Sequence, residues 1–342
     1  MPFSIAPVLA LRGRLVAVLA SGDPFWHGVG GTIAATLDPT EYRSFPAAST
    51  FSRAAAVMGW RIEDTICLGL HAAPLTRLRP VLTRGARIIA LLRDGNAVAE
   101  LAAYLTATGF GLSTITALQA LGGPREVRFS CTAQHPDLTE ISSPVCAAIT
   151  VQGAPGLPSA NGLDDSLFDH DGQITKRPIR ALTLSALAPR AGETLWDIGT
   201  GSGSVSIEFL LSAHATQSYA VESDPSRATR ALKNAETFGL THRFHLTQSR
   251  APAGLETLPK PDAVFIGGGA TDALLTALWN LIPENTRLVV NAVTLEAETL
   301  LFQWSANHGG NLLRIELSQA EPLGTKRGWQ PLRPITQWSV TR

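Results

Sequence analysis

The sequence predicts an α/β protein of two domains, of which the second contains a doubly wound sheet. At 342 residues the chain is too long for one ordinary domain and long enough for two separate cores. Short apolar runs typical of buried strands alternate with helical segments along both halves. In the second half, residues 195–205 (LWDIGTGSGSV) read as a strand, a glycine turn and a helix, a unit typical of nucleotide-binding sheets.

The first half contains six apolar runs that we expect to be strands, separated by helices. Gly59 and Gly109 follow two of these helices, and glycine readily adopts the backbone conformation that ends a helix. The first run leads into Ser21-Gly22-Asp23-Pro24, which either wraps a ligand or is an ordinary turn. The expected strands are 15–20, 65–70, 87–92, 113–118, 127–132 and 147–151, and the expected helices are 28–36, 51–58 and 98–108.

A segment rich in proline, glycine and aspartate separates the two halves. Residues 153–172 lack apolar periodicity, so we expect an interdomain linker there. The sequence therefore predicts a first domain at 1–152 and a second at 173–342. No internal repeat at a solenoid period is present.

The second half continues the alternation of strands and helices. Pro178 suits a first helical turn, and Asp224 with Pro225 is typical of a capped helix start. The expected helices are 178–187, one that begins near Gly203, 225–238, 272–281 and 295–307. The expected strands are 195–198, 218–222, 244–247, 263–266 and 287–291, with 312–317 and 336–340 as a closing antiparallel pair. In such a sheet the ligand crevice lies at the carboxyl ends of the strands.

The glycine turn and the next strand predict a nucleoside site. Gly199, Gly201 and Gly203 allow a sharp turn and close approach of a ligand to the backbone. Glu222 ends the following strand, where a carboxylate can accept both hydroxyls of a ribose. A dinucleotide fingerprint needs glycine where this chain has Ser204, and Asp197 would repel a pyrophosphate but suits an ammonium group. We therefore expect S-adenosylmethionine, with an ordinary strand-to-helix turn as the alternative.

Composition and motifs limit the other function classes. The 28 basic and 28 acidic residues cancel, so we expect no nucleic-acid partner. Three cysteines without Cys-x-x-Cys spacing read as buried thiols of a reducing compartment, and no histidine cluster indicates a metal. No basic residue precedes the apolar N-terminus, and no apolar run approaches the roughly 18 residues of a membrane span. We expect a cytoplasmic protein without a membrane partner.

The second half contains the motifs Thr175-Lys176, the glycine turn, FIGGG at 265–269, NAVTLE at 291–296, Gly328-Trp329 and PITQW at 334–338. Together these motifs resemble the decarboxylating precorrin-6Y C5,15-methyltransferase family of cobalamin biosynthesis. The first half is similar to the tetrapyrrole methylase domain of the same family through LASGDP at 19–24, FPAASTF at 45–51 and LGGP at 121–124. The resemblance implies a tetrapyrrole methylase-like α/β domain followed by a class I Rossmann-like methyltransferase domain.

The resemblance also implies the reaction and the site residues. Members methylate carbons 5 and 15 of precorrin-6Y with two molecules of S-adenosylmethionine and remove the carboxyl group of the ring C acetate, giving precorrin-8X. The first domain would serve carbon 5, and the second would serve carbon 15 and the decarboxylation. The expected cofactor residues are Thr175, Asp197, Gly199, Thr200, Gly201, Ser202, Gly203, Glu222 and Ala251 in the second domain, and Gly22 and Asp23 in the first.

A tetrapyrrole that carries many carboxylates should meet basic side chains at the rim of its site. The expected substrate residues are Lys176, Arg180, Gly268, Asn291, Lys326, Arg327 and Trp329, and ordinary solvated charge is the alternative for each basic one. No catalytic acid or base is identified, because aligning donor and acceptor and excluding water suffice for methyl transfer. We also expect a homo-oligomer.

This chain departs from the family at its start. Tetrapyrrole methylases open with a strand and a Gly-x-Gly-Pro-Gly loop, and here the sequence begins after that loop. Either the true start lies upstream, or the first domain lacks part of its pocket, and for the chain as given we expect slow or absent carbon 5 methylation. Three alternative interpretations of the sequence exist. An RNA or DNA methyltransferase is disfavoured by Gly267–Gly269 at its substrate loop, and an NAD-dependent dehydrogenase by Ser204. A first domain that only scaffolds the second is the third.

Overall fold

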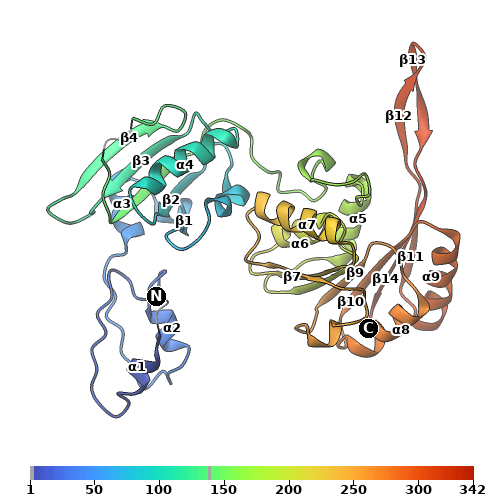
Figure 1. The fold of residues 1–342 in the computed structure, drawn as a ribbon, viewed down its shortest axis with the longest axis horizontal. Coiled ribbons are helices and arrows are strands. Elements are labelled where there is room, and N and C mark those ends of the chain that lie inside the picture. Colours follow the sequence, from blue (N-terminus) through green and yellow to red (C-terminus); the bar gives the residue numbers. More distant parts are fainter. Residues whose placement is uncertain (1–3, 138–139) are drawn as a thin grey trace. The chain divides into compact units, whose positions relative to one another are not determined.

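The computed structural model describes residues 4–137 and 140–342, which form two compact units, unit 1 up to Gly156 and unit 2 from Leu157. Segment 153–172, predicted as a linker, is divided between them. From Leu157 onward it belongs to unit 2, where Leu163 and Phe168 are buried in the hydrophobic core beside Ile207 and Phe238. Each unit has its own sheet and its own core (Figure 1).

Unit 1 contains a five-stranded sheet in the order β1-β2-β5-β3-β4. β1 and β2 are parallel, and β5 is antiparallel to both β2 and β3. Ile88 and Ala90 of β2 pack with helix α4, whereas Ile89 packs with helix α3, so alternate residues of the strand serve opposite faces. The elements are β1 (Ile66–Gly69), β2 (Arg87–Leu91), β3 (Thr114–Gln119), β4 (Val127–Thr132), β5 (Val145–Thr150), α3 (Thr50–Met58) and α4 (Asn96–Ala107).

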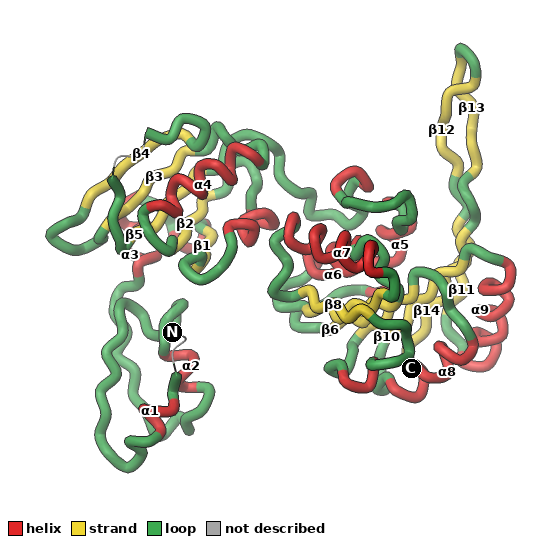
Figure 2. Tube along the Cα trace, in the orientation of Figure 1, coloured by secondary structure: helices red, strands yellow, loops and turns green. Residues whose placement is uncertain are grey.

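The beginning of unit 1 differs from the sequence prediction. Residues 15–20 form no strand, and the predicted helix 28–36 is reduced to α2 (Gly30–Ala34) beside a short α1 (Ala6–Leu9). Leu15 and Leu19 are almost fully exposed, and Figure 2 shows most of the segment before α3 as loop. A buried strand needs neighbouring strands that hydrogen-bond to it and other elements that cover it. Residues 15–20 have neither in the described structure, because edge strand β1 pairs only with β2.

Unit 2 contains a seven-stranded sheet in the order β11-β14-β10-β9-β6-β7-β8. β6 (Thr194–Ile198) lies between β7 (Gln217–Glu222) and β9 (Ala263–Ile266), and all three are parallel. The chain runs outward from β6 through β7 to β8 on one side, and through β9 to β10 on the other. The sheet is completed by β8 (Phe244–Gln248), β10 (Arg287–Ala292), β11 (Asn311–Ile315) and the antiparallel β14 (Ile335–Thr341).

Helices cover both faces of this sheet, which confirms the predicted doubly wound fold. One face packs against α5 (Arg177–Leu187), α6 (Ser204–Ser212) and α7 (Pro225–Thr237). The other packs against α8 (Asp272–Leu281) and α9 (Leu295–His308) (Figure 1). The order in which the chain adds strands reverses at β6, with β7 added on one side and β9 on the other. In sheets of this kind, ligands bind at the carboxyl ends of the strands at such a reversal, which here is the turn after β6.

One element of unit 2 was not predicted. Strands β12 (Ser318–Leu323) and β13 (Lys326–Pro331) form a two-stranded hairpin that is inserted between β11 and β14. Figure 1 shows it extending away from the seven-stranded sheet. Leu323 and Trp329 are 70% and 77% exposed, so the hairpin carries apolar side chains that are not covered in this structure.

None of the described helices has the length and apolar character that a bilayer span requires.

Candidate functional site

The turn after β6 combines open backbone with close packing. Gly199, Gly201 and Gly203 all have positive φ, at 70°, 59° and 76°. A Cβ atom at Gly201 would meet nothing within 4 Å, whereas one at Gly203 would lie 3.3 Å from the Cβ of Ala231 on α7. Gly201 therefore leaves room for a ligand, and Gly203 lets α7 pack behind the turn.

A second glycine turn lies next to the first. A Cβ at Gly199 would have as its nearest neighbour the carbonyl oxygen of Gly268, 3.9 Å away, because β6 and β9 are adjacent. Gly268 itself has nothing within 4 Å of its own Cβ position. The two turns thus bring the predicted cofactor residue Gly199 beside the predicted substrate residue Gly268.

Asp197, near the end of β6, is buried and only partly satisfied. Its Oδ2 accepts hydrogen bonds from Thr200 Oγ1 at 2.6 Å and from Ser206 Oγ at 2.5 Å. Its Oδ1 has no hydrogen-bond partner among the described residues. Burial raises the pKa of Asp197 to about 6, against the lowering effect of these bonds. A buried carboxylate oxygen without a donor is suited to bind a cationic or hydrogen-bonding ligand.

Glu222 ends β7 and supports the same turn. Its Oε2 accepts a hydrogen bond from the amide of Gly201 at 2.9 Å, and its Oε1 accepts one from the amide of Asp224 at 2.9 Å. The side chain is buried, at 5% exposure. Each carboxylate oxygen can accept a further bond, so Glu222 can receive two hydroxyl donors while it remains fixed.

Thr175 and Lys176 directly precede α5. The carbonyl of Thr175 accepts a hydrogen bond from Arg180 Nη1 at 2.5 Å, and Lys176 is exposed at the N-cap. Ala251 lies in the loop after β8, where it lines a shallow concavity of about 640 Å³ with Arg250, Pro252 and residues of α8. The adjacent Ser249 donates its amide to the Glu222 carbonyl at 3.0 Å, so this loop is joined to the end of β7.

The prediction that Arg180 grips substrate at an exposed rim is wrong. Its side chain is 0% exposed and donates to Glu208 Oε1 at 2.5 Å and Asp165 Oδ1 at 3.0 Å. Its guanidinium also lies 4.7 Å from the ring centroid of Phe168. The position of Arg180 in the sequence does not show which face of α5 is buried. Here that face is buried, and the carboxylate of Glu208 on α6 compensates the charge of the Arg180 guanidinium.

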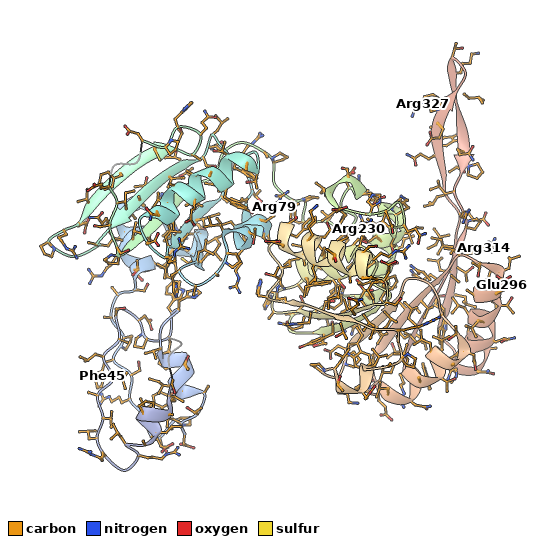
Figure 3. All side chains as sticks on the ribbon, in the orientation of Figure 1. Phe45, Arg79, Arg230, Glu296, Arg314 and Arg327 are labelled. Carbon is orange, nitrogen blue, oxygen red and sulfur yellow. The ribbon has the colours of Figure 1, made fainter. Side chains whose placement is uncertain are left out.

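Asn291 and the predicted hairpin residues lie in different environments. Asn291 is buried, and its amide bonds Thr183 Oγ1 at 3.0 Å and Gln337 Nε2 at 2.9 Å, which joins α5, β10 and β14. Lys326, Arg327 and Trp329 are on the hairpin, with Arg327 labelled in Figure 3. No hydrogen bond or ion pair recorded for the described residues connects these three side chains with the glycine turn.

Gly22 and Asp23 of unit 1 line a separate cavity of about 360 Å³ with Ser21, His27 and Phe51. Asp23 Oδ1 accepts a hydrogen bond from the amide of Phe25 at 2.8 Å, and this bond stabilises a turn of the backbone at Asp23. Gly22 has a φ of 67°, and a Cβ there would lie 3.3 Å from the Cα of Ser49, so glycine is required by close backbone approach.

In the described residues, no group of three or more His, Cys, Asp and Glu side chains could hold a metal ion.

The sequence did not reveal three buried polar residues on the helices next to the turn. Ser206 bonds both Asp197 and Ser218, and Glu208 and Asn234 are also buried. Each interrupts the buried face of an otherwise apolar or alanine-rich helix. Such a residue on the inward stripe of a helix is the signal that could have revealed them, because buried polar groups need partners.

Comparisons with known proteins cover both units. Residues 166–342 match the family model described as a precorrin methyltransferase domain, and residues 5–137 match the model of tetrapyrrole (corrin/porphyrin) methylases. A protein of Sinorhizobium sp, named precorrin-6Y C(5,15)-methyltransferase [decarboxylating], is 46% identical over 99% of this chain and 83% of its own length.

Two further relatives match part of the chain. The solved C-terminal domain of precorrin-6Y C5,15-methyltransferase from Rhodobacter capsulatus is 54% identical, covers 54% of this chain and 100% of its own, and has a TM-score of 0.53. A protein of Saccharolobus solfataricus named "Probable cobalt-precorrin-6B C(15)-methyltransferase (decarboxylating)" is 37% identical over 40% of this chain and 71% of its own length.

Proposed function

The chain belongs to the family of decarboxylating precorrin-6Y C5,15-methyltransferases, and from this membership we propose that it methylates precorrin-6Y at carbons 5 and 15 with S-adenosylmethionine. Decarboxylation of the ring C acetate accompanies these steps and gives precorrin-8X in cobalamin biosynthesis. We assign carbon 15 and the decarboxylation to unit 2. The relative from Saccharolobus solfataricus matches 40% of this chain, and its name mentions only C15 methylation and decarboxylation, so we keep these two steps together in one unit.

The observation that carries the proposal is the pair of buried carboxylates around the open turn. Asp197 has an unpartnered oxygen, Glu222 has free acceptor positions, and the backbone at Gly201 is unobstructed. These features fit the ammonium group, the ribose and the close backbone approach of S-adenosylmethionine. Bound there, the cofactor would supply a methyl group on a sulfonium centre.

The chain's own residues position and shield the reactants. In this proposal Glu222 and Asp197 orient the donor, and the flat macrocycle lies beside the turn that contains Gly268, whose Cβ position is unobstructed. Exclusion of water from this edge strengthens the electrostatic interactions and favours loss of a carboxylate as carbon dioxide. No side chain is assigned as the proton donor.

The experiment compares donor binding by calorimetry in the parent protein and in Glu222→Ala. Loss of two bonds to a charged acceptor, each about 1.5–3 kcal/mol, predicts an affinity at least about a hundredfold lower. Glu236→Ala, an exposed carboxylate on α7, is the matched control and should bind as the parent does. Equal affinity in Glu222→Ala and the parent would disprove the site.

Unit 1 is proposed to serve carbon 5, and the cavity at Gly22 and Asp23 is its proposed donor site. The substrate is proposed to be a polycarboxylate held partly by Lys176, Lys326 and Arg327, which are exposed in this structure. Its affinity should fall as salt rises, because exposed charge pairs are screened. We propose a homo-oligomer that acts in the cytoplasm.

A further inference from the structure

Residues 162–176, here called the strap, precede α5 and cross beside α6 and α7 (Figure 1). Buried groups hold the beginning of the strap. Glu208 accepts the amides of Gly162 at 2.6 Å and Leu163 at 2.9 Å, and Arg180 donates to the Leu163 carbonyl at 2.5 Å. The same guanidinium bonds the Thr175 carbonyl, so Arg180 joins the two ends of the strap.

The middle of the strap is held by the side chain of Asn234 on α7. Its Oδ1 accepts the amide of Asp169 at 2.8 Å, and its Nδ2 donates to the Asp169 carbonyl at 2.9 Å. The same Nδ2 donates to the carbonyl of Ser202 at 2.9 Å. Ser202 belongs to the glycine turn, so one buried amide, 2% exposed, bonds both the strap and the turn.

Asn234 is placed for this by the helix that supports the turn. Ala231, three residues earlier and therefore on the same helix face, packs against Gly203. Surface ion pairs add to the contact, since Lys233 bonds Asp169 at 2.8 Å and Arg230, labelled in Figure 3, lies 3.3 Å from Asp171. These charges are at least a quarter exposed and contribute little, whereas Asn234 is shielded from water.

We propose that Asn234 is a positioning residue for the methyl donor, because it fixes the glycine turn and the strap that carries Thr175 in one arrangement. The inference rests on the proposed function, since it concerns the same donor site. Asn234 does not touch the reacting atoms. Without its two donated bonds, the Ser202 and Asp169 carbonyls lose their common partner, and the turn is no longer held in the geometry that receives the donor.

The test measures steady-state kinetics of the full chain with S-adenosylmethionine and precorrin-6Y for Asn234→Leu and Asn234→Asp. Asn234→Asp keeps the acceptor for the Asp169 amide and places an oxygen against the two carbonyls. We expect the KM for S-adenosylmethionine to rise about tenfold in both variants, with kcat at saturating donor and the KM for precorrin-6Y within about twofold. Thr237→Ala, exposed on the same helix, is the control and should change none of these.

A purely structural role would lower the folded fraction and hence the apparent kcat, without moving the donor KM. An unchanged donor KM in folded Asn234→Asp would therefore overturn the inference, and that near-isosteric variant decides the matter if Asn234→Leu does not fold. Calorimetry separates this failure from failure of the proposed function. If the parent does not bind S-adenosylmethionine, the function is wrong; if parent and variant bind equally, only the role of Asn234 is wrong.

Discussion

The charge of the Asp197 carboxyl group is sensitive to pH near neutrality. Burial raises the pKa of this group to about 6, above the ordinary value of 3.8. A carboxyl group with a raised pKa is protonated at pH 5 and largely ionised at pH 7. In the proposed site an ammonium group beside Oδ1 would favour the ionised form, so donor binding would be coupled to proton release.

Donor affinity should therefore fall as pH is lowered through 6. Between pH 7 and pH 5 we expect the dissociation constant of S-adenosylmethionine to rise about tenfold, because most of the Asp197 carboxyls must first lose a proton. Calorimetry at both pH values checks this. Asp197→Asn should bind weakly and equally at pH 5 and pH 7, and equal affinity of the parent at the two pH values would contradict the assignment.

At the level of single residues, spacing in the sequence indicated some roles and concealed others. The alternating glycines and Glu222 are recognisable because the strand and the turn fix their positions along the chain. The roles of Arg180 and Asn234 are not recognisable in this way, because they depend on partners that are distant in sequence. Arg180 meets Glu208 only after the helices have packed. The same holds for Asn234 with Asp169 and Ser202. Whether a charged or polar helix residue faces water or a buried partner is a property of that packing.

Among the helices, the contact between α5 and α6 includes the buried ion pair of Arg180 and Glu208 beside apolar packing. Arg180→Met should lower the free energy of unfolding of unit 2 by about 3–5 kcal/mol, since it leaves a buried carboxylate without its cation. Denaturant unfolding of unit 2 measures the loss. The double variant Arg180→Met with Glu208→Gln should recover part of the lost free energy of unfolding. A loss below about 1 kcal/mol in Arg180→Met alone would show that Glu208 does not need the cation of Arg180.

Most elements of unit 2 follow the sequence closely. The helix at Asp272–Leu281 and the strand at Ala263–Ile266 agree at both ends, and the antiparallel pairing of β11 with β14 is confirmed. Two elements show the limits of apolar patterning. The run at 15–20 is apolar enough for a strand but finds no partner, whereas β12 and β13 pair with each other despite polar sequences that carried no strand signal.

For the whole molecule, the division at Leu157 makes a simple prediction. Residues 157–342 should fold alone, because they contain their own sheet and core, and because the similar C-terminal domain of the Rhodobacter capsulatus protein was solved on its own. Given S-adenosylmethionine and precorrin-6Y, this fragment should yield a product that has gained one methyl group and lost carbon dioxide. Mass spectrometry of the product decides, and a fragment that adds two methyl groups would contradict the assignment of carbon 5 to unit 1.

The exposed hairpin has a consequence for limited proteolysis. Lys326 and Arg327 lie beside the Gly324 turn, where trypsin should cut the native chain early. The released end would contain β14, which is hydrogen-bonded between β10 and β11 and contains the buried Trp338. We therefore expect two peptides that separate on a denaturing gel but elute together in native chromatography. Resistance to trypsin at high protein concentration, lost on dilution, would indicate that another copy of the chain covers the hairpin.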